Sequence, residues 1–172
     1  MRAALELFDE RGYDTTTAAA IAERAGVTEM TFFRHFTSKD AVLIADPYDP
    51  LIAEAIRRQP VDLPPLAAAI GGVVDAWSGV PAPGSAEVRE RLRIVSRTPS
   101  LRGALARNSA ETEAAIADAL TARGASGSDA RIAASATVGA LNAALLDWAD
   151  GVDPELGTAI AAALRVLRGG AR

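Results

Sequence analysis

The sequence predicts an all-α protein in which a small N-terminal helical domain precedes a larger helical bundle. Hydrophobic residues make up 49% of the 172 positions, enough for a buried core, whereas aromatic residues make up only 5%. Alanine dominates the apolar fraction and is the strongest helix former. Runs of β-branched and aromatic residues, which are typical of strands, are scarce. We therefore expect helices throughout.

The composition also excludes several classes of site. The chain has no cysteine, so disulfides, thiol catalysis and cysteine-ligated metals are excluded. His35 is the one histidine, which excludes any site that needs two imidazoles. No stretch of about 18 unbroken apolar residues predicts a membrane span, and no signal-peptide pattern opens the chain. We expect a cytoplasmic protein without metal, cofactor, catalytic residues or membrane contact.

Four helical segments are predicted before residue 46. The apolar spacing and the residues that begin and end helices place them at 2–11, 18–25, 28–34 and from about 37 onward. Gly12, which adopts positive φ freely, ends the first. Thr17 and Thr28 can cap the second and third, and Thr37 with Asp40 forms a capping-box-like start for the fourth.

The remaining chain predicts longer helices separated by proline and glycine. Because proline breaks or kinks a helix, we expect a bend at Asp46-Pro47 and a continuation to Arg58. Further helices are predicted at 65–78, 85–98, 99–123, 129–149 and 154–168, with a loop at 79–84. The expected domains are a helix-turn-helix domain at 1–45 and a ligand-binding and dimerisation domain at 46–172.

Two of the N-terminal helices have the features of a helix-turn-helix. That motif needs two short helices joined by a tight turn, and Gly26 supplies the turn between the second and third helices. The space between them can be filled by Ile21, Ala22, Ala25, Val27 and Phe32. In such motifs the second helix enters the major groove and the first crosses the DNA backbone. The segment 17–36 is therefore predicted to bind double-stranded DNA.

The sequence of this region resembles a known family. Residues 3–43 read AALELFDERGYDTTTAAAIAERAGVTEMTFFRHFTSKDAVL. The spacing of their glycine, threonine and aromatic residues is similar to that of the TetR family of bacterial regulators. The resemblance implies an N-terminal DNA-binding domain and a C-terminal helical domain that binds a small molecule and forms a homodimer. It also implies action as a repressor on a double-stranded operator.

The resemblance implies which side chains contact DNA. Glu29 and Met30 correspond to positions that contact bases, and His35 and Lys39 correspond to phosphate contacts. Phe33 departs from the family, which has a tyrosine there whose hydroxyl binds phosphate. The phenyl ring can instead pack against a DNA sugar. Two alternatives stay open, since Glu29 can face solvent and His35 can be a capped surface histidine.

The chemistry of other side chains adds further candidates. Thr31 can contact a thymine methyl group or a base edge. Thr17 and Thr28 lie at predicted helix N-termini, where a hydroxyl can bind phosphate or act only as a cap. Arg34 and Arg24 are further candidate phosphate partners.

Neither the charge of residues 1–45 nor that of the whole chain favours binding to DNA. Residues 1–45 contain five basic and seven acidic side chains, and the whole chain has a net charge of −4. The prediction therefore depends on where the basic groups lie rather than on their number. Because the chain opens within the first helical pattern, we expect residues before Met1 to add contacts.

The resemblance also implies that the last two helices pair with those of a second copy. In the first of them alanines recur with Leu141 and Leu145, and the second offers Leu156, Ile160 and Leu164. Small residues at a period of 3.6 allow close helix packing, and an operator with paired half-sites requires paired domains. These stripes can equally be ordinary core.

A narrower resemblance involves the segment RTPSL at 97–101, which precedes a long helix. It is similar to mycofactocin-associated regulators, a subgroup whose C-terminal domain is described as binding acyl-CoA-like ligands. This implies an apolar tunnel for an acyl chain and cations at its mouth for phosphates. The candidate ligand residues are Trp77, Arg93, Arg97, Asn108 and Asn142, with Val73, Val95 and Leu105 among the apolar candidates for the tunnel. Each can instead be structural, such as Trp77 in the core or Asn142 across the dimer.

The mechanism that follows is a population shift. A ligand in the C-terminal domain would favour a state in which the bend at Asp46-Pro47 moves the paired recognition helices out of register with successive major grooves. The ligand can shift this equilibrium only by its difference in affinity for the two states.

Two other classes of function are alternatives to a transcriptional regulator. An enzyme would be expected to show a nucleophile elbow, a P-loop or a dinucleotide fingerprint, and the sequence has none of these. The second alternative is a helical protein-interaction module with a degenerate helix-turn-helix and no effector. The acidic N-terminal segment and Phe33 favour it.

Overall fold

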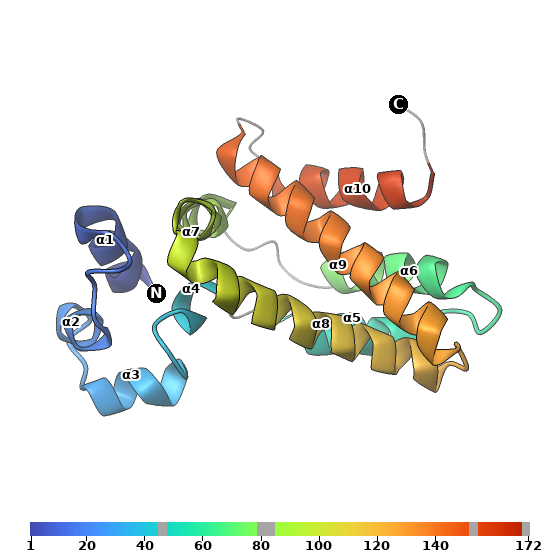
Figure 1. Ribbon diagram of the computed structural model, residues 1–172, viewed down its shortest axis with the longest axis horizontal. Helices are drawn as coiled ribbons and strands as arrows, with labels where there is room; N and C mark the ends of the chain where they lie inside the picture. The colour runs from blue at the N-terminus through green and yellow to red at the C-terminus, as the bar shows by residue number, and fades with distance from the viewer. Residues whose placement is uncertain (45–47, 79–84, 152–154, 170–172) are drawn as a thin grey trace. The chain divides into compact units, whose positions relative to one another are not determined.

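The structure is a computed structural model that describes residues 1–44, 48–78, 85–151 and 155–169. Every regular element in these ranges is helical, as the sequence predicts (Figure 1). The predicted bend at Asp46-Pro47, the loop at 79–84 and the residue Pro154 lie outside the described ranges.

The chain forms two compact units. The first contains Met1–Ala45 and Ala86–Asn108, and the second contains Asp46–Ser85 and Ser109–Arg172. The division expected from the sequence, at 45 and 46, differs from this one because 86–108 pack with the N-terminal helices. The difference matters for charge, since 86–108 carry six basic and two acidic side chains. The first unit therefore has a net charge of +2 and the second a net charge of −6.

The first unit holds the N-terminal helices predicted from the sequence. Its elements are α1 (Arg2–Arg11), α2 (Ala18–Arg24), α3 (Glu29–His35), α4 (Ala41–Ile44), most of α7 (Ser85–Arg97), the 3-10 turn η1 (Pro99–Leu101) and the start of α8 (Arg102–Ala122). Gly12 ends α1 with a φ of 81°, as predicted. The core includes Leu7, Phe8, Ile21 and Phe32, and Val95 from α7 packs among them.

Three local predictions in this unit are wrong. The fourth helix begins at Ala41, and its N–H donates to Ser38 Oγ at 3.2 Å, so Ser38 rather than the exposed Thr37 takes the capping role. Pro99 opens a 3-10 turn, and the α-helix starts only at Arg102. Val95 lies in the core of the first unit rather than in a tunnel of the C-terminal domain.

The second unit is a helical bundle. Its elements are α5 (Asp49–Arg58), α6 (Pro65–Ser78), the remainder of α8, α9 (Gly127–Asp150) and α10 (Leu156–Leu167). Helix α9 packs along α10 and against α6, which in turn packs along α5 (Figure 1). Ser126 Oγ accepts a hydrogen bond from Asp129 N at 3.1 Å, which confirms the predicted cap of α9.

Helices α5 and α6 approach each other so closely that one position requires glycine. A Cβ placed on Gly72 would lie 2.3 Å from Ile56 Cγ1 and 2.8 Å from Ile56 N. Ile56 is fully buried in the core of this unit, so it has no space in which to move aside.

Helix α9 buries one face within the single chain. Its buried side chains are Ala130, Ala133, Ala134, Thr137, Val138, Trp148 and Ala149. Ala143, one of the alanines that recur with Leu141 and Leu145, is exposed and so is open to the predicted pairing with a second copy. In α10 the predicted residues Leu156, Ile160 and Leu164 are buried. Among the described helices α9 alone is long and apolar enough to span a membrane, and a third of that stretch is buried within the chain.

Candidate nucleic-acid interface

Helices α2 and α3 are joined by a tight turn centred on Gly26. The N–H of Gly26 donates to Glu23 O at 3.0 Å, and the N–H of Val27 donates to Ala22 O at 3.0 Å. Gly26 has a φ of 69°, a conformation that side chains disfavour. No atom lies within 4 Å of a Cβ placed there, so the requirement for glycine is one of backbone conformation. The helix-turn-helix predicted from the sequence is present.

Both helices begin with the predicted threonine caps. Thr17 Oγ1 accepts from Ala20 N at 3.1 Å, and Thr28 Oγ1 accepts from Thr31 N at 3.2 Å. The Thr28 hydroxyl donates its proton to Thr31 Oγ1 at 3.0 Å. Since that proton is used, the Thr28 hydroxyl can meet a phosphate only by breaking this bond. The hydroxyl proton of Thr31 stays available for a base or a phosphate.

Helix α3 is fixed by one buried aromatic side chain. Phe32 is buried. Its ring packs edge-on against Phe33, at 5.2 Å between centroids, and tilted against Phe36, at 5.5 Å. Burial of Phe32 turns the opposite side of this short helix outward. The exposed side chains are Glu29, Met30, Phe33, Arg34 and His35, with Thr31 half-buried. The structure thus places six of the nine predicted DNA contacts on one helix.

Lys39 has a structural role that the sequence did not reveal. Its Nζ donates hydrogen bonds to Tyr13 O and Thr16 O, both at 2.8 Å, and lies 4.0 Å from the centroid of the Tyr13 ring. These contacts connect the turn after α1 to the segment before α4. A lysine ammonium has three N–H groups, so one remains for the phosphate contact predicted from the sequence.

The Tyr13 hydroxyl shares this environment. Burial of the ring raises the pKa of Tyr13 to about 12, and the carboxylates of Asp40 and Asp14 add to that increase. Asp14 in turn accepts a 2.5 Å hydrogen bond from Ser100, in the 3-10 turn η1.

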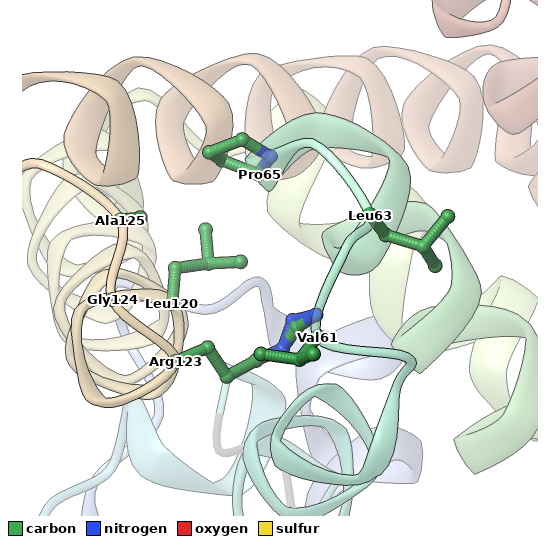
Figure 2. A pocket seen from close by; sticks show the side chains of 7 residues that line it. All are labelled: Val61, Leu63, Pro65, Leu120, Arg123, Gly124 and Ala125. Carbon is green, nitrogen blue, oxygen red and sulfur yellow. The ribbon is translucent and has the colours of Figure 1, made fainter.

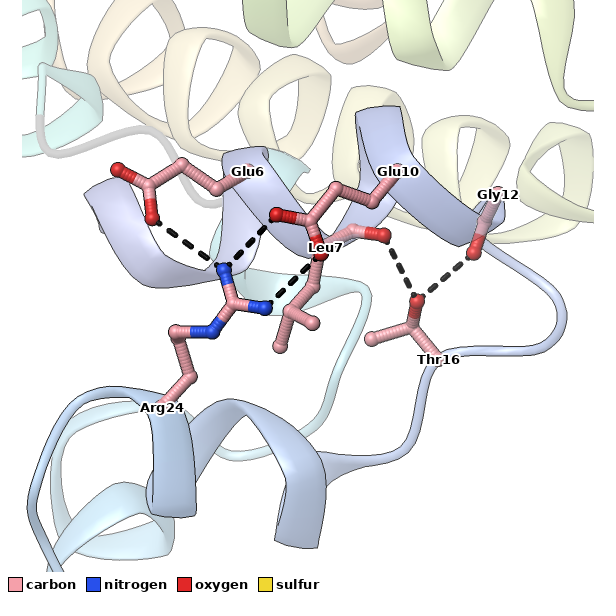
Figure 3. Close-up of polar contacts among 6 residues, drawn as sticks. All are labelled: Glu6, Leu7, Glu10, Gly12, Thr16 and Arg24. Atoms are coloured by element: carbon pink, nitrogen blue, oxygen red, sulfur yellow. Dashed lines mark hydrogen bonds and ion pairs between the residues drawn. The ribbon is translucent and has the colours of Figure 1, made fainter.

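Arg24 is held by two carboxylates of α1 rather than left for DNA. Its guanidinium donates to both carboxylate oxygens of Glu10, at 3.0 and 2.9 Å, and lies 3.6 Å from Glu6 (Figure 3). The hydrogen bond from Arg24 lowers the pKa of Glu10, and the same bond raises the pKa of Arg24. Thr16, also drawn in Figure 3, is buried and donates to Gly12 O at 2.8 Å. Thr16 Oγ1 also donates to Leu7 O at 3.3 Å, so Arg24 joins α2 to α1 and Thr16 joins the segment before α2 to α1.

The helices α7 and α8 add basic side chains to the same unit. Arg91 donates from Nε and from its terminal nitrogen to Leu43 O, at 3.2 and 2.8 Å. Arg107 lies 3.5 Å from the carboxylate of Asp40. The first contact is to α4 itself, and the second is to the residue that precedes it. Arg91, Arg107 and the positive balance of 86–108 were not connected to this domain by sequence reasoning.

The predicted ligand residues are divided between the two units. Arg93, Arg97 and Asn108 belong to the first unit, whereas Trp77 and Asn142 belong to the second. Asn142 donates a 2.9 Å hydrogen bond to Ser109 Oγ on α8. The ring of Trp77 lies 6.1 Å from that of Tyr48, and it also lies beside Gly157. Each of the two therefore has a structural contact within its unit.

A cavity of about 150 Å³ lies in the second unit, between the 60–65 segment and the turn from α8 to α9 (Figure 2). It is lined by Val61, Leu63, Pro65, Leu120, Arg123, Gly124 and Ala125. Drug-sized ligand sites occupy roughly 300 to 1,000 Å³. This cavity is smaller, and none of the five predicted ligand residues lines it.

Comparisons with known proteins agree with this geometry. The family model for bacterial regulatory proteins of the tetR family matches residues 1–45, and the MftR C-terminal domain model matches residues 63–172. The HTH-type transcriptional regulator TcmR of Streptomyces glaucescens is 36% identical over 131 residues, which is 72% of this chain. The chain spans 58% of the length of that curated relative.

Solved structures show the same fold. Thermus thermophilus FadR, a TetR-family repressor in complex with lauroyl-CoA, is 26% identical and has a TM-score of 0.53, over 98% of this chain and 91% of that one. A TetR-family regulator from Mesorhizobium loti, at 22% identity and a TM-score of 0.50 over 98% and 92% of the two chains, supports the fold alone. With family models matching both units, the chain belongs to the TetR family of bacterial regulatory proteins, which are transcriptional regulators rather than enzymes, and carries an MftR-type C-terminal domain.

Proposed function

We propose that the chain is a cytoplasmic DNA-binding transcriptional regulator that acts as a dimeric repressor. The observation that supports this most strongly is the outward face of α3. Its side chains are presented to solvent by the burial of Phe32 and by the Gly26 turn. The net charge of +2 on the first unit, against −6 on the second, favours contact of this unit with phosphates.

The proposed contacts follow from where the side chains lie. Glu29, Met30, Thr31 and Phe33 would contact base edges in the major groove. The cationic Arg34 and the ring N–H of His35 would contact phosphates, since both are exposed on the last turn of α3. Lys39 would add its third N–H. Thr28 would contribute through the backbone that its cap positions, whereas the Thr17 hydroxyl, which accepts in its cap, would donate its proton to a phosphate.

We propose a homodimer formed by α9 and α10. Ile132 on α9 and Val166 on α10 are each 65% exposed in the single chain, which is unfavourable for large apolar side chains unless a partner covers them. Only a third of the most apolar stretch of α9 is buried within the chain. A two-fold axis between two copies would cover the same surface on both and pair the recognition helices.

We propose a small apolar or acyl-CoA-like effector as the ligand of the second unit. The support comes from the lauroyl-CoA bound to FadR, a relative at 26% identity. The side chains to test are Trp77 and Asn142 in the second unit and Arg93, Arg97 and Asn108 in the first. The described cavity of about 150 Å³ is small for an acyl chain, so binding at that place would require its walls to part.

Selection of duplexes from a random-sequence DNA library by the full chain tests the function. A dimer of recognition helices predicts enrichment of an inverted repeat whose half-site centres lie about 34–36 Å apart. Arg34→Ala should weaken binding to the enriched duplex, whereas Arg168→Ala, an exposed arginine after α10, should not. Lauroyl-CoA added to the complex should release the DNA. A library that yields no enriched sequence would contradict the proposal and favour a protein-interaction module.

A further inference from the structure

The outward face of α3 exposes large apolar side chains beside its polar ones. Met30 is 81% exposed and Phe33 is 48% exposed, and Val27, just before the helix, is 41% exposed. Residues three apart in a helix lie on the same face, so Met30 and Phe33 share one face. Exposed apolar side chains gathered in this way mark a surface that contacts something apolar.

The two side chains differ in stiffness. The ring of Phe33 is held at an interplanar angle of 85° against the buried Phe32, which limits its freedom. Met30 is unbranched and has a polarisable thioether, so it can adapt to the shape beside it. Together they make a surface in which the Phe33 ring is fixed and the Met30 side chain can adjust its shape. Such a surface is suited to enclosing a small apolar group.

The major groove offers one apolar group on its base edges, the C5 methyl of thymine. The polar groups beside Met30 and Phe33 are consistent with entry into that groove, because Arg34 and His35 lie exposed on the last turn of the same helix. The Thr28 hydroxyl is already bonded to Thr31, which reduces the hydrogen-bonding capacity of the first turn for base edges. This face therefore offers base edges more apolar contact than hydrogen bonding.

We propose that α3 recognises thymine by its methyl group, which Met30 and Phe33 bury in each half-site. The inference rests on the proposed DNA-binding function and adds the chemical feature that the site selects. It predicts an operator with at least one thymine in each half-site. The protein would distinguish this thymine from other bases by its methyl group rather than by its hydrogen-bonding edge.

Uracil substitution tests this directly, because deoxyuridine keeps the hydrogen-bonding edge of thymidine and lacks only the methyl group. The probe is a duplex enriched by the full chain from a random library, prepared again with deoxyuridine at the thymines of its half-sites. Burial of one methyl group corresponds to about a fourfold change in Kd, and one in each of two half-sites to about fifteenfold. Deoxyuridine in the flanking sequence should leave Kd unchanged.

A variant cycle identifies the side chains that bury the methyl group. Met30→Ala should weaken binding to the thymine duplex and reduce the ratio of the two Kd values toward 1, because the methyl group then loses one of the two side chains that bury it. Val61→Ala is the matched control, since Val61 is also 81% exposed but lies in the second unit. It should keep the full ratio. Phe33→Ala should also reduce the ratio, and Met30→Ala decides the matter if loss of the Phe32 contact unfolds that variant.

The possible outcomes distinguish a failure of methyl recognition from a failure of DNA binding. Equal Kd values for the thymine and uracil duplexes, with tight and salt-sensitive binding to both, would overturn methyl recognition and leave DNA binding intact. A ratio that Met30→Ala does not alter would overturn the assignment of the contact to this face. Failure to bind any duplex at low salt would instead overturn the proposed function itself.

Discussion

The ammonium of Lys39 lies 4.0 Å from the centroid of the Tyr13 ring and donates a 2.8 Å hydrogen bond to the carbonyl of the same residue. This contact, with the second bond to Thr16 O, connects two segments that lie on either side of the helix-turn-helix. A family position associated with phosphate therefore also holds the motif together.

Replacement of Lys39 by methionine should lower the free energy of unfolding. The methionine keeps an apolar stem but removes two charge-assisted hydrogen bonds, which contribute about 1.5–3 kcal/mol each at most. Denaturant titration of the purified chain measures the change. Arg34→Met is the matched control, because Arg34 is an exposed cation on α3 and its loss should leave unfolding unchanged. Equal stability of Lys39→Met and wild type would show that the contacts with Tyr13 and Thr16 contribute nothing.

Tyr13 should make the stability of the first unit depend on pH at alkaline values. Its pKa is raised to about 12 in the folded chain, against about 10 in the unfolded chain. Above pH 10 the unfolded chain loses the phenol proton while the folded chain still keeps it. The contribution to stability is therefore complete below pH 10 and is lost as pH rises to about 12.

Denaturant titrations at pH 9 to 12 should show this decline in the wild type and less of it in Tyr13→Phe. Absorbance of the phenolate provides a direct measurement, with Tyr48→Phe as the background because it leaves Tyr13 as the only tyrosine. A midpoint near 10 in the folded chain would contradict the environment described for Tyr13.

Release of Arg24 should strengthen DNA binding. In the free protein its guanidinium is bonded to Glu10, and α2 is the helix expected to cross the DNA backbone. Glu10→Ala should therefore lower Kd at low salt and steepen the salt dependence, since one more cation can reach a phosphate. Asp9→Ala removes the same charge from α1 without releasing Arg24. If both variants gain affinity equally, only the net charge matters and Arg24 makes no contact.

Replacement of Gly72 by alanine should lower the stability of the chain more than replacement of its neighbour Gly71. A Cβ on Gly72 meets the buried Ile56 and its backbone, and overpacking of this kind lowers the free energy of unfolding by about 1–3 kcal/mol. A Cβ on Gly71 meets the end of the Gln59 side chain, which can rotate away although it bonds Asp75 at 2.6 Å. Thermal unfolding of the two variants gives the order, and a larger loss for Gly71→Ala would contradict the α5–α6 packing.

The sequence alone predicts those parts of this structure that depend on neighbours in the chain. The caps at Thr17, Thr28 and Ser126 and the turn at Gly26 are of this kind, because each involves groups within a few residues. The family resemblance likewise places the exposed side chains of α3.

Contacts between distant segments of the chain could not be predicted from the sequence. Lys39 is 26 residues from Tyr13, and Arg91 is 48 residues from Leu43. No periodicity or spacing indicates that either pair meets. For the same reason the charge of the first 45 residues appeared unfavourable, since the six basic side chains of 86–108 pack with that unit only in the folded chain.

The salt dependence of DNA binding tests the central claim most directly. Two copies that each place Arg34 and Lys39 on phosphates make about four ionic contacts, for which log Kd should rise with log salt at a slope of about 3.6. Kd for the duplex selected by the full chain should then weaken by about 100-fold between 50 and 200 mM salt. Arg34→Ala should reduce the slope by about 2, one contact for each copy. A Kd that does not change with salt, or no binding at 50 mM, would contradict the assignment of α3 as a DNA recognition helix.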